Sequence, residues 1–178
     1  GITGSGIALD AASRGMKVLL LEKQDFAAGT SSRSTKLIHG GLRYLKQLEF
    51  GLVRQVGRER DTLYQNASYL VHPEKLLLPI YKRGSLGYFS NSVGLWFYDL
   101  LAGVKKKEKR IMLSKKKAMQ EEIMLSEDGL LGAGLYYEYR TDDARLTLEV
   151  LKTAVNYGAK AFNYLELNAF VETNGKIT

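Results

Sequence analysis

The sequence has no cysteine, two histidines and two prolines among its 178 residues. The lack of cysteine excludes disulfides, thiolate metal sites and a cysteine nucleophile. Two histidines, His39 and His72, are too few for a histidine-rich metal site, so no bound metal is expected. Long apolar runs are also missing, because the most apolar stretch, residues 93–104, contains Asp99 and is far shorter than the roughly 20 residues of a membrane-spanning helix.

Positive charge is in excess and unevenly distributed. The formal net charge is +7, and much of it lies in residues 105–110 (KKKEKR) and 115–117 (KKK). Such runs are usually solvated surface. The functional alternatives are attraction to an anionic membrane face or steering of an anionic substrate. No nucleic-acid partner is expected, because the basic residues are not interleaved with aromatic residues and no nucleic-acid-binding signature is present.

The opening residues, GITGSGIALDAASRGMKVLLLEKQ, contain most of a dinucleotide-binding fingerprint. The small residues over 5–13 predict a helix, and the apolar run over 17–22 predicts a parallel strand buried on both faces. Gly1 and Gly4 have the spacing of the second and third glycines of the fingerprint, which allow close approach to the pyrophosphate and packing of helix on strand. Glu22 ends the strand, where an acid accepts hydrogen bonds from the adenosine ribose.

A second segment, residues 25–46, combines hydroxyls, glycines and basic residues. The hydroxyl groups with Lys36 can bind a pyrophosphate, paired glycines let the backbone approach a flat ring, and Arg43 offers a fixed fork for an anion. The hydroxyl residues are Thr30, Ser31, Ser32 and Ser34, and the paired glycines are Gly40 and Gly41.

The stretch TSSRSTKLIHGGLRYL, together with GITGSG and EYRTDDARLTLEV, resembles the FAD-dependent glycerol-3-phosphate dehydrogenases. That family belongs to the wider D-amino-acid-oxidase-like flavoproteins. The resemblance extends over the whole chain and implies an α/β fold. In that fold an FAD-binding, Rossmann-like parallel sheet is interleaved with an antiparallel-sheet substrate domain.

The resemblance also implies roles for individual residues. Those expected to contact the cofactor are Gly1, Gly4, Glu22, Thr30, Ser31, Ser32, Ser34, Lys36, His39, Gly40, Gly41 and Leu42, the last four near the ring. Arg43 and Tyr44 are expected to meet the substrate. Simpler alternatives stay open: Arg43 pairing with Glu49, Tyr44 packing in the core, and His39 bonding a backbone carbonyl or, in another type of flavoprotein, tethering the flavin.

The implied reaction is oxidation of sn-glycerol 3-phosphate to dihydroxyacetone phosphate, with a hydride passing to the flavin and electrons then passing to a membrane quinone. Alternatives are an oxidase that uses oxygen, another D-amino-acid-oxidase-like flavoprotein, a nicotinamide-dependent dehydrogenase, and a non-catalytic module with a basic surface. The hydroxyl-rich segment and HGGLRY argue against the nicotinamide enzyme. No residue is assigned as the catalytic base.

The expected location is cytoplasmic, with peripheral association at the inner face of the cell membrane as an open alternative. The aromatic-rich residues 88–104 predict a helix that packs on a sheet, or else a membrane-facing amphipathic patch. The oligomeric state is open, with a homodimer as one candidate. Because the chain lacks an initiator Met, the first fingerprint glycine and the strand before it, we expect a fragment truncated at both ends that binds flavin weakly by itself.

The remaining pattern suggests three segments: 1–72 and 141–178 in the FAD-binding domain, and 73–140 in the substrate domain. Apolar spacing predicts a helix over 51–70, with strands at 76–81 and 135–140. Ser114 is expected to cap a short basic helix, and Thr141 or Asp142 to cap a helix that ends near 157. Strands are expected at 161–164 and 167–172, followed by a hairpin turn at Asn174 and Gly175.

Overall fold

The computed structural model describes residues 1–39, 41, 44–45, 47–82, 87–101, 103–104 and 106–177. The chain divides into two compact units. Unit 1 is formed by both ends of the sequence, Gly1–Lys36 and Thr141–Thr178, and unit 2 by the intervening Leu37–Arg140. The sequence-based division at 72 and 140 stays a prediction about functional domains. The compact units differ from it by placing residues 37–72 in unit 2.

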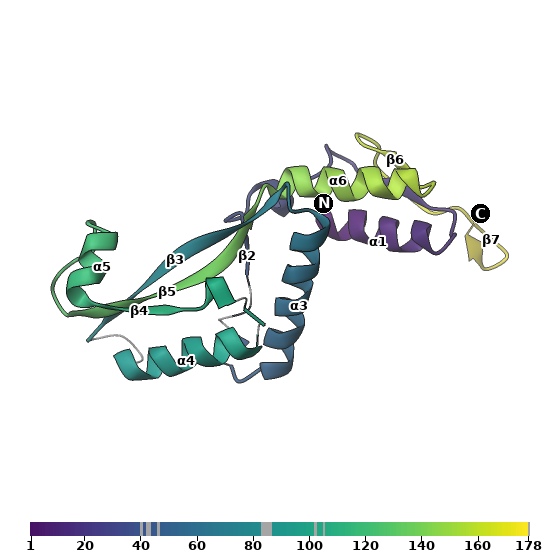
Figure 1. Ribbon diagram of the computed structural model, residues 1–178. Helices are drawn as coiled ribbons and strands as arrows, with labels where there is room; N and C mark the ends of the chain where they lie inside the picture. Colours follow the sequence, from purple (N-terminus) through teal and green to yellow (C-terminus); the bar gives the residue numbers. More distant parts are fainter. Residues whose placement is uncertain are drawn as a thin grey trace. The chain divides into compact units, whose positions relative to one another are not determined.

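Unit 1 contains a parallel strand pair and two long helices that lie side by side (Figure 1). Strand β1 pairs in parallel with β6, with Leu19 opposite Lys160. The elements of this unit are α1 (Ile2–Ser13), β1 (Leu19–Leu21), the 3₁₀ helix η1 (Thr30–Ser32), α6 (Asp143–Asn156), β6 (Lys160–Phe162), β7 (Glu172–Thr173) and β8 (Lys176–Ile177). The predicted helix over 5–13 and the parallel strand within 17–22 are confirmed. The expected burial of this strand on both faces is wrong, because Leu19 is exposed and Leu20 and Leu21 are only half-buried.

The core of unit 1 is built largely from alanine. Ala8 and Ala12 of α1 are buried against Ala154 of α6 and against Ala159, which precedes β6. Leu9, Val18 and Leu20 pack around this cluster. Side chains this small let the two helices approach closely, as interior packing requires. The small-residue pattern of the opening helix therefore has a packing role in addition to any role in ligand binding.

Unit 2 is an antiparallel sheet with helices. Its elements are β2 (Leu37–Ile38), α3 (Phe50–Asn66), β3 (Val71–Tyr81), α4 (Tyr88–Leu101), η2 (Lys106–Glu108), β4 (Ile111–Ser114), α5 (Lys115–Glu121) and β5 (Leu130–Thr141). Strand β5 is the shared strand: β4 pairs with its first half and β2 with its last residues, while β3 also neighbours it. Helix α4 runs along one face of the sheet (Figure 1).

Two glycines of β5 allow the close packing of this sheet. A Cβ atom added at Gly132 would lie 2.3 Å from the carbonyl oxygen of Leu113, and one at Gly134 would lie 2.5 Å from Leu95 Cδ1 of α4. Glycine in a strand often marks such close approach. A second hydrophobic cluster joins the sheet to α5. It consists of Leu113, Ala118, Leu130 and Ala133, of which Ala118 belongs to α5.

Several local expectations need correction. The expected strand at 167–172 is wrong in its extent, because within the described residues the strand there is Glu172–Thr173. Strand β3 starts at Val71, five residues before the expected strand, and contains Pro73. Ser114 occupies the N-cap position of α5 but makes no side-chain capping hydrogen bond.

The hairpin turn is confirmed: Asn174 and Gly175 have φ values of 54° and 72°, as a type I′ turn requires.

Candidate cofactor-binding site

The N-terminus of α1 is joined to the hydroxyl-rich segment by a direct hydrogen bond. The backbone N–H of Ile2 donates to Ser31 Oγ over 2.9 Å. Gly1 is the N-cap residue, and a Cβ atom added there would lie only 3.1 Å from the same Ser31 Oγ. Glycine at this position therefore keeps the first turn of the helix close to η1. A helix N-terminus of this kind has free N–H groups and the positive end of the helix dipole, both of which favour anions.

Glu22 lies near the same helix end. Its backbone N–H continues the ladder to β6 by donating to the Phe162 carbonyl, over 2.9 Å. Its Oε2 atom is 3.7 Å from the Gly1 nitrogen, and Oε1 accepts the N–H of Gln24 over 3.0 Å. Strand, glycine turn, helix N-terminus and terminal acid thus meet at one edge of unit 1. This is the arrangement by which dinucleotide-binding folds hold a ribose and a pyrophosphate.

Gly4 is sterically less demanding than Gly1. A Cβ atom added at Gly4 would meet Leu20 Cδ1 at 3.9 Å, an ordinary van der Waals contact. The sequence assigns Gly4 to close packing of helix on strand. That role stays a prediction, because the measured distance leaves room for a methyl group.

The hydroxyl-rich segment brings Lys36 next to several oxygen atoms of unit 1. The Lys36 N–H donates to Ser34 Oγ over 2.9 Å, and Nζ donates to the Ser32 carbonyl over 3.4 Å. Ser34 Oγ in turn donates to the carboxylate of Asp143, whose Oδ2 is 4.0 Å from Lys36 Nζ. Thr30 and Ser32 are exposed, whereas Ser31 is buried by its bond to α1.

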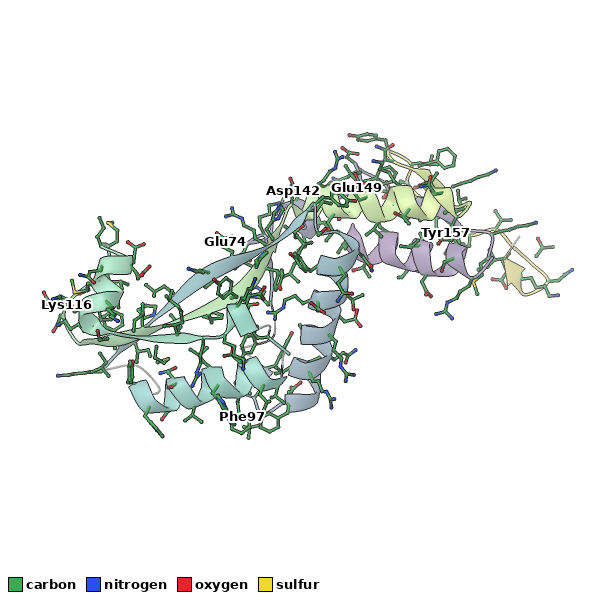
Figure 2. All side chains as sticks on the ribbon, in the orientation of Figure 1. Glu74, Phe97, Lys116, Asp142, Glu149 and Tyr157 are labelled. Carbon is green, nitrogen blue, oxygen red and sulfur yellow. The ribbon has the colours of Figure 1, made fainter. Side chains whose placement is uncertain are left out.

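Asp143 is a member of this cluster that sequence reasoning did not connect with Lys36. The sequence predicted a capping role for Thr141 or Asp142 at this helix start, and Asp142 indeed caps α6 by accepting the Arg145 N–H over 3.1 Å. Figure 2 shows Asp142 at the beginning of α6 and Tyr157 at its other end. No local pattern predicts the Asp143 contact, since 109 residues separate Asp143 from Ser34.

The residues expected near the flavin ring lie in unit 2, after β2. Gly40, Leu42 and Arg43 fall outside the described residues. Gly41 is buried with φ of +91°, and its carbonyl accepts the Tyr44 N–H over 2.9 Å. An added Cβ atom would lie 3.2 Å from the Tyr44 ring and 3.6 Å from Val53 Cα. A glycine is therefore needed here for backbone conformation and for space. His39 and Tyr44 are exposed.

Unit 2 also contains a buried polar cluster, here called the buried triad: Arg60 of α3, Tyr98 of α4 and Glu138 of β5. Arg60 Nη1 donates to Tyr98 Oη over 3.0 Å and to Glu138 Oε2 over 3.2 Å, and Tyr98 Oη donates to Glu138 Oε1 over 3.0 Å. The sequence did not flag these residues. Arg60 shares the buried side of α3 with Val53 and Gly57, but a side that holds a glycine and an arginine gives no apolar stripe in the sequence.

Burial governs the protonation of this region. It raises the pKa of the Tyr98 hydroxyl strongly, with the nearby Glu138 charge acting in the same direction, so the hydroxyl stays a neutral donor. Burial likewise raises the pKa of Asp99, although the Arg110 N–H that Asp99 accepts over 3.0 Å opposes this. The pKa of Tyr139 is raised by burial and by its hydrogen bond to Glu108.

The chemistry of unit 1 fits FAD. Backbone N–H groups at a helix end, hydroxyls and a lysine suit a pyrophosphate, and a carboxylate suits a ribose. In the described part of the chain, no group of three His, Cys, Asp or Glu side chains could hold a metal ion. None of the described helices is both long enough and apolar enough to cross a bilayer.

Known proteins resemble this chain over nearly its full length. It is 59% identical over 176 residues to the aerobic glycerol-3-phosphate dehydrogenase of Bacillus subtilis, which covers 99% of this chain. The solved structure of the Bacillus halodurans glycerol-3-phosphate dehydrogenase complexed with FAD matches 99% of this chain and 27% of its own, with 42% identity and a TM-score of 0.73. The L-proline dehydrogenase of P. horikoshii shares the fold, with a TM-score of 0.71 at 20% identity over 99% of this chain and 45% of its own.

The chain spans about a third of the length of the curated relatives it matches, 32% for the B. subtilis protein. The α/β fold expected from the sequence, with a parallel and an antiparallel sheet, is confirmed by these structures and by the topology described above. The family model for DAO, FAD dependent oxidoreductase, matches residues 1–178. The chain therefore belongs to the FAD-dependent oxidoreductases of the D-amino-acid-oxidase type.

Proposed function

We propose that this chain carries part of the cofactor site of an enzyme that uses FAD to oxidise sn-glycerol 3-phosphate to dihydroxyacetone phosphate. The observation that carries the proposal is the 59% identity, over 99% of the chain, to a relative named aerobic glycerol-3-phosphate dehydrogenase. The local geometry supports it, because the α1 N-terminus, Ser31 and Glu22 gather donors and an acceptor suited to a dinucleotide.

The cofactor would be held mainly by unit 1. Amide groups at Gly1 and the start of α1, with Gly4 behind them, would face the pyrophosphate, and Glu22 would accept from the adenosine ribose. When bound, FAD supplies the hydride acceptor that the oxidation of a secondary alcohol requires. The further cofactor contacts in this proposal are Thr30, Ser31, Ser32, Ser34 and Lys36, with His39, Gly40, Gly41 and Leu42 near the ring.

Lys36 is well placed to change partners when an anion binds. Its ammonium lies 4.0 Å from the Asp143 carboxylate and is 31% exposed, so the existing pair is loose and accessible. An entering phosphate would bring a second negative group near Lys36 and strengthen its role as a counter-charge. Asp143 would orient Lys36 through Ser34, which binds both residues.

Substrate contact is proposed for Arg43 and Tyr44. A guanidinium matches a phosphate with two parallel hydrogen bonds, and the exposed Tyr44 ring stands beside Gly41. The net charge of +7 would add long-range attraction for a dianionic substrate.

A membrane quinone is the proposed electron acceptor, with oxygen as the alternative. The test measures the rate at which the full-length gene product oxidises sn-glycerol 3-phosphate under two conditions. In the first, a soluble quinone analogue is the acceptor and oxygen is absent; in the second, oxygen is the sole acceptor. A quinone-linked enzyme turns over at least about tenfold faster with the analogue. Rapid hydrogen peroxide formation at an undiminished rate would favour the oxidase.

Peripheral association with the inner face of the cell membrane is proposed through the outer side of α4. This side exposes Phe89, Val93, Trp96, Phe97 and Leu100. Figure 2 shows Phe97 on the side of α4 away from the sheet. The exposed Lys107 and Lys109 follow the helix and would complement anionic lipid. The opposite side of α4 packs against the rest of unit 2, as the other sequence expectation for this helix required: there Leu95 and Tyr98 are buried.

Lipid binding is tested by co-sedimentation of the full-length gene product with phosphatidylglycerol vesicles. The double variant Trp96→Ser, Phe97→Ser is expected to lose most of the binding. Phe170→Ser, which changes an even more exposed aromatic in unit 1, is the control and should bind like the unmodified protein. Equal binding by all three would remove α4 from the proposal. The homodimer stays a prediction, to be checked by light scattering.

The catalytic proposal is tested by product analysis. The full-length gene product, given sn-glycerol 3-phosphate and an artificial dye acceptor, is expected to form dihydroxyacetone phosphate in equal amount to reduced dye. Glycerol and the opposite enantiomer, sn-glycerol 1-phosphate, are the matched controls, and neither should support turnover. Equal rates with glycerol would show that no phosphate-binding group contributes and would contradict the assignment of Arg43.

A further inference from the structure

The connecting segment, residues 39–49, joins β2 to α3 and contains every residue proposed for the ring and the substrate in unit 2. Its first end follows β2, whose Ile38 is paired with Tyr139 of β5. Its last end leads directly into α3, which begins at Phe50. The position of the segment therefore depends on how α3 is held relative to β5.

The buried triad makes that connection. Arg60 comes from α3 and Glu138 from β5, next to Tyr139, and their ion pair spans 3.2 Å. Tyr98 bridges the two from α4 with hydrogen bonds of 3.0 Å to each partner. Arg60 also lies over the Tyr139 ring, with Cζ 4.9 Å from its centroid. All three members of the triad are at most 4% exposed, so water does not weaken these contacts.

Packing continues from the triad to the segment itself. Tyr98 and Val53 form one buried cluster, against which Leu45 of the segment packs. Val53 in turn lies against Gly41, where an added Cβ atom would be 3.6 Å from Val53 Cα. A single path of contact thus leads from Glu138 through Tyr98 and Val53 to Leu45, which follows Tyr44, and to Gly41, whose carbonyl accepts the Tyr44 N–H.

A purely hydrophobic cluster would fix the relative orientation of α3, α4 and β5 less precisely. Aliphatic contacts tolerate sliding, whereas a charged pair bridged by a phenol has one favourable geometry, and breaking it leaves a buried charge unsatisfied.

We propose that the buried triad of Arg60, Tyr98 and Glu138 is a positioning element that fixes Gly41, Tyr44 and Leu45 of the connecting segment, and through them the substrate contact proposed for Tyr44. The role of the segment in substrate binding rests on the proposed function, whereas the fixing of its conformation does not.

Tyr98→Phe is the most direct test, because it removes the bridging hydroxyl and leaves the ring. Glu138→Gln is the second variant, since it keeps the shape and weakens the charged pair. Tyr136→Phe is the matched control: its ring packs on Tyr98 with centroids 6.3 Å apart, but it belongs to no part of the triad. All are made in the full-length gene product, with FAD content measured for each.

The first measurement is hydrogen exchange of the amides in residues 39–49, with α6 as internal reference. Exchange in this segment is expected to increase in Tyr98→Phe and Glu138→Gln, while α6 and the Tyr136→Phe control stay unchanged. A folded Tyr98→Phe protein with normal exchange in this segment would overturn the proposal. If one of the two variants does not fold, the other decides.

The second measurement separates positioning from general damage. KM for sn-glycerol 3-phosphate is expected to rise about tenfold with kcat per bound FAD within about twofold, because a misplaced binding group weakens substrate contact. A lower kcat with unchanged KM would mean partial inactivation and overturn the link to substrate. If the unmodified protein does not oxidise the substrate at all, the proposed function fails, and the exchange measurement alone decides whether the triad fixes the segment.

Discussion

The guanidinium of Arg60 lies 3.2 Å from the carboxylate of Glu138, and the two side chains are 4% and 2% exposed. Such a buried pair is costly to break from one side, because the remaining charge loses its partner without regaining water. Its effect on stability and its effect on positioning can be measured separately.

Arg60→Met is expected to lower the free energy of unfolding by about 3–5 kcal/mol, the range for leaving one member of a buried pair uncompensated. The double variant Arg60→Met, Glu138→Leu should recover most of that loss, since two apolar side chains then pack together. Urea denaturation followed by circular dichroism measures both. A double variant as unstable as the single one would show that the pair itself is not the source.

Gly132→Ala is expected to destabilise the protein by about 1–3 kcal/mol, the usual cost of overpacking. The added methyl would meet the Leu113 backbone oxygen at 2.3 Å, and backbone in a paired strand cannot move aside as a flexible side chain does. Gly51→Ala in α3, where nothing lies within 4 Å, is the control and should be neutral or slightly stabilising. Thermal unfolding of the two variants gives the comparison.

The burial of Asp99 leads us to expect that the stability of the protein depends on pH. Burial raises the pKa of Asp99 in the folded protein, so the folded state binds the proton more readily than the unfolded chain. The contribution of Asp99 to stability is then largest at low pH and falls as pH rises from the ordinary value of about 3.9 through the raised one. Asn at this position cannot titrate and can still accept the Arg110 N–H.

The stability of Asp99→Asn relative to the unmodified protein should therefore increase between pH about 3 and pH 7. Denaturant unfolding at a series of pH values measures this difference. If the difference stayed constant or fell with rising pH, Asp99 would have to be stabilised in its charged form, contrary to its burial.

Gly1 and Gly4 should differ in their tolerance of alanine. A methyl at Gly1 presses on Ser31 Oγ at 3.1 Å and disturbs the Ile2 hydrogen bond, whereas one at Gly4 meets Leu20 at 3.9 Å. In the full-length gene product, Gly1→Ala is expected to weaken FAD binding about tenfold, or about 1.4 kcal/mol. Gly4→Ala should bind nearly normally. Flavin fluorescence titration of the apoproteins measures both, and equal losses would contradict the steric account.

Local signals predicted much of the fold. The turn-helix-strand order at the N-terminus, the helix capped by Asp142 and the Asn174-Gly175 hairpin all follow from residues within a few positions of one another. The prediction failed over most of residues 167–172: the strand there is Glu172–Thr173, which includes the last of these residues, and Leu167 and Phe170 are exposed. An alternating pattern does not by itself set where a strand begins, because that depends on its hydrogen-bonded partner.

Long-range contacts could not be predicted in the same way. Ser34 meets Asp143 where the η1 segment packs against α6, far away in the sequence. Glu138 looks like an ordinary alternating residue of LYYEYR until Arg60 and Tyr98 are placed beside it. The apolar spacing that predicts a helix over 51–70 includes Leu52 and Val56, which are only half-buried in α3. The buried side lies one position further along, at Val53 and Gly57. Because the buried side of α3 contains Arg60, a search for an apolar stripe does not identify it.

The visible spectrum of the full-length gene product, recorded as sn-glycerol 3-phosphate is added without oxygen, tests the cofactor and the substrate together. We expect an oxidised flavin band that bleaches within one turnover and returns when quinone or oxygen is admitted. A flavin band that stays unchanged would contradict glycerol 3-phosphate as the substrate, and a colourless protein that does not take up added FAD would contradict the cofactor site itself.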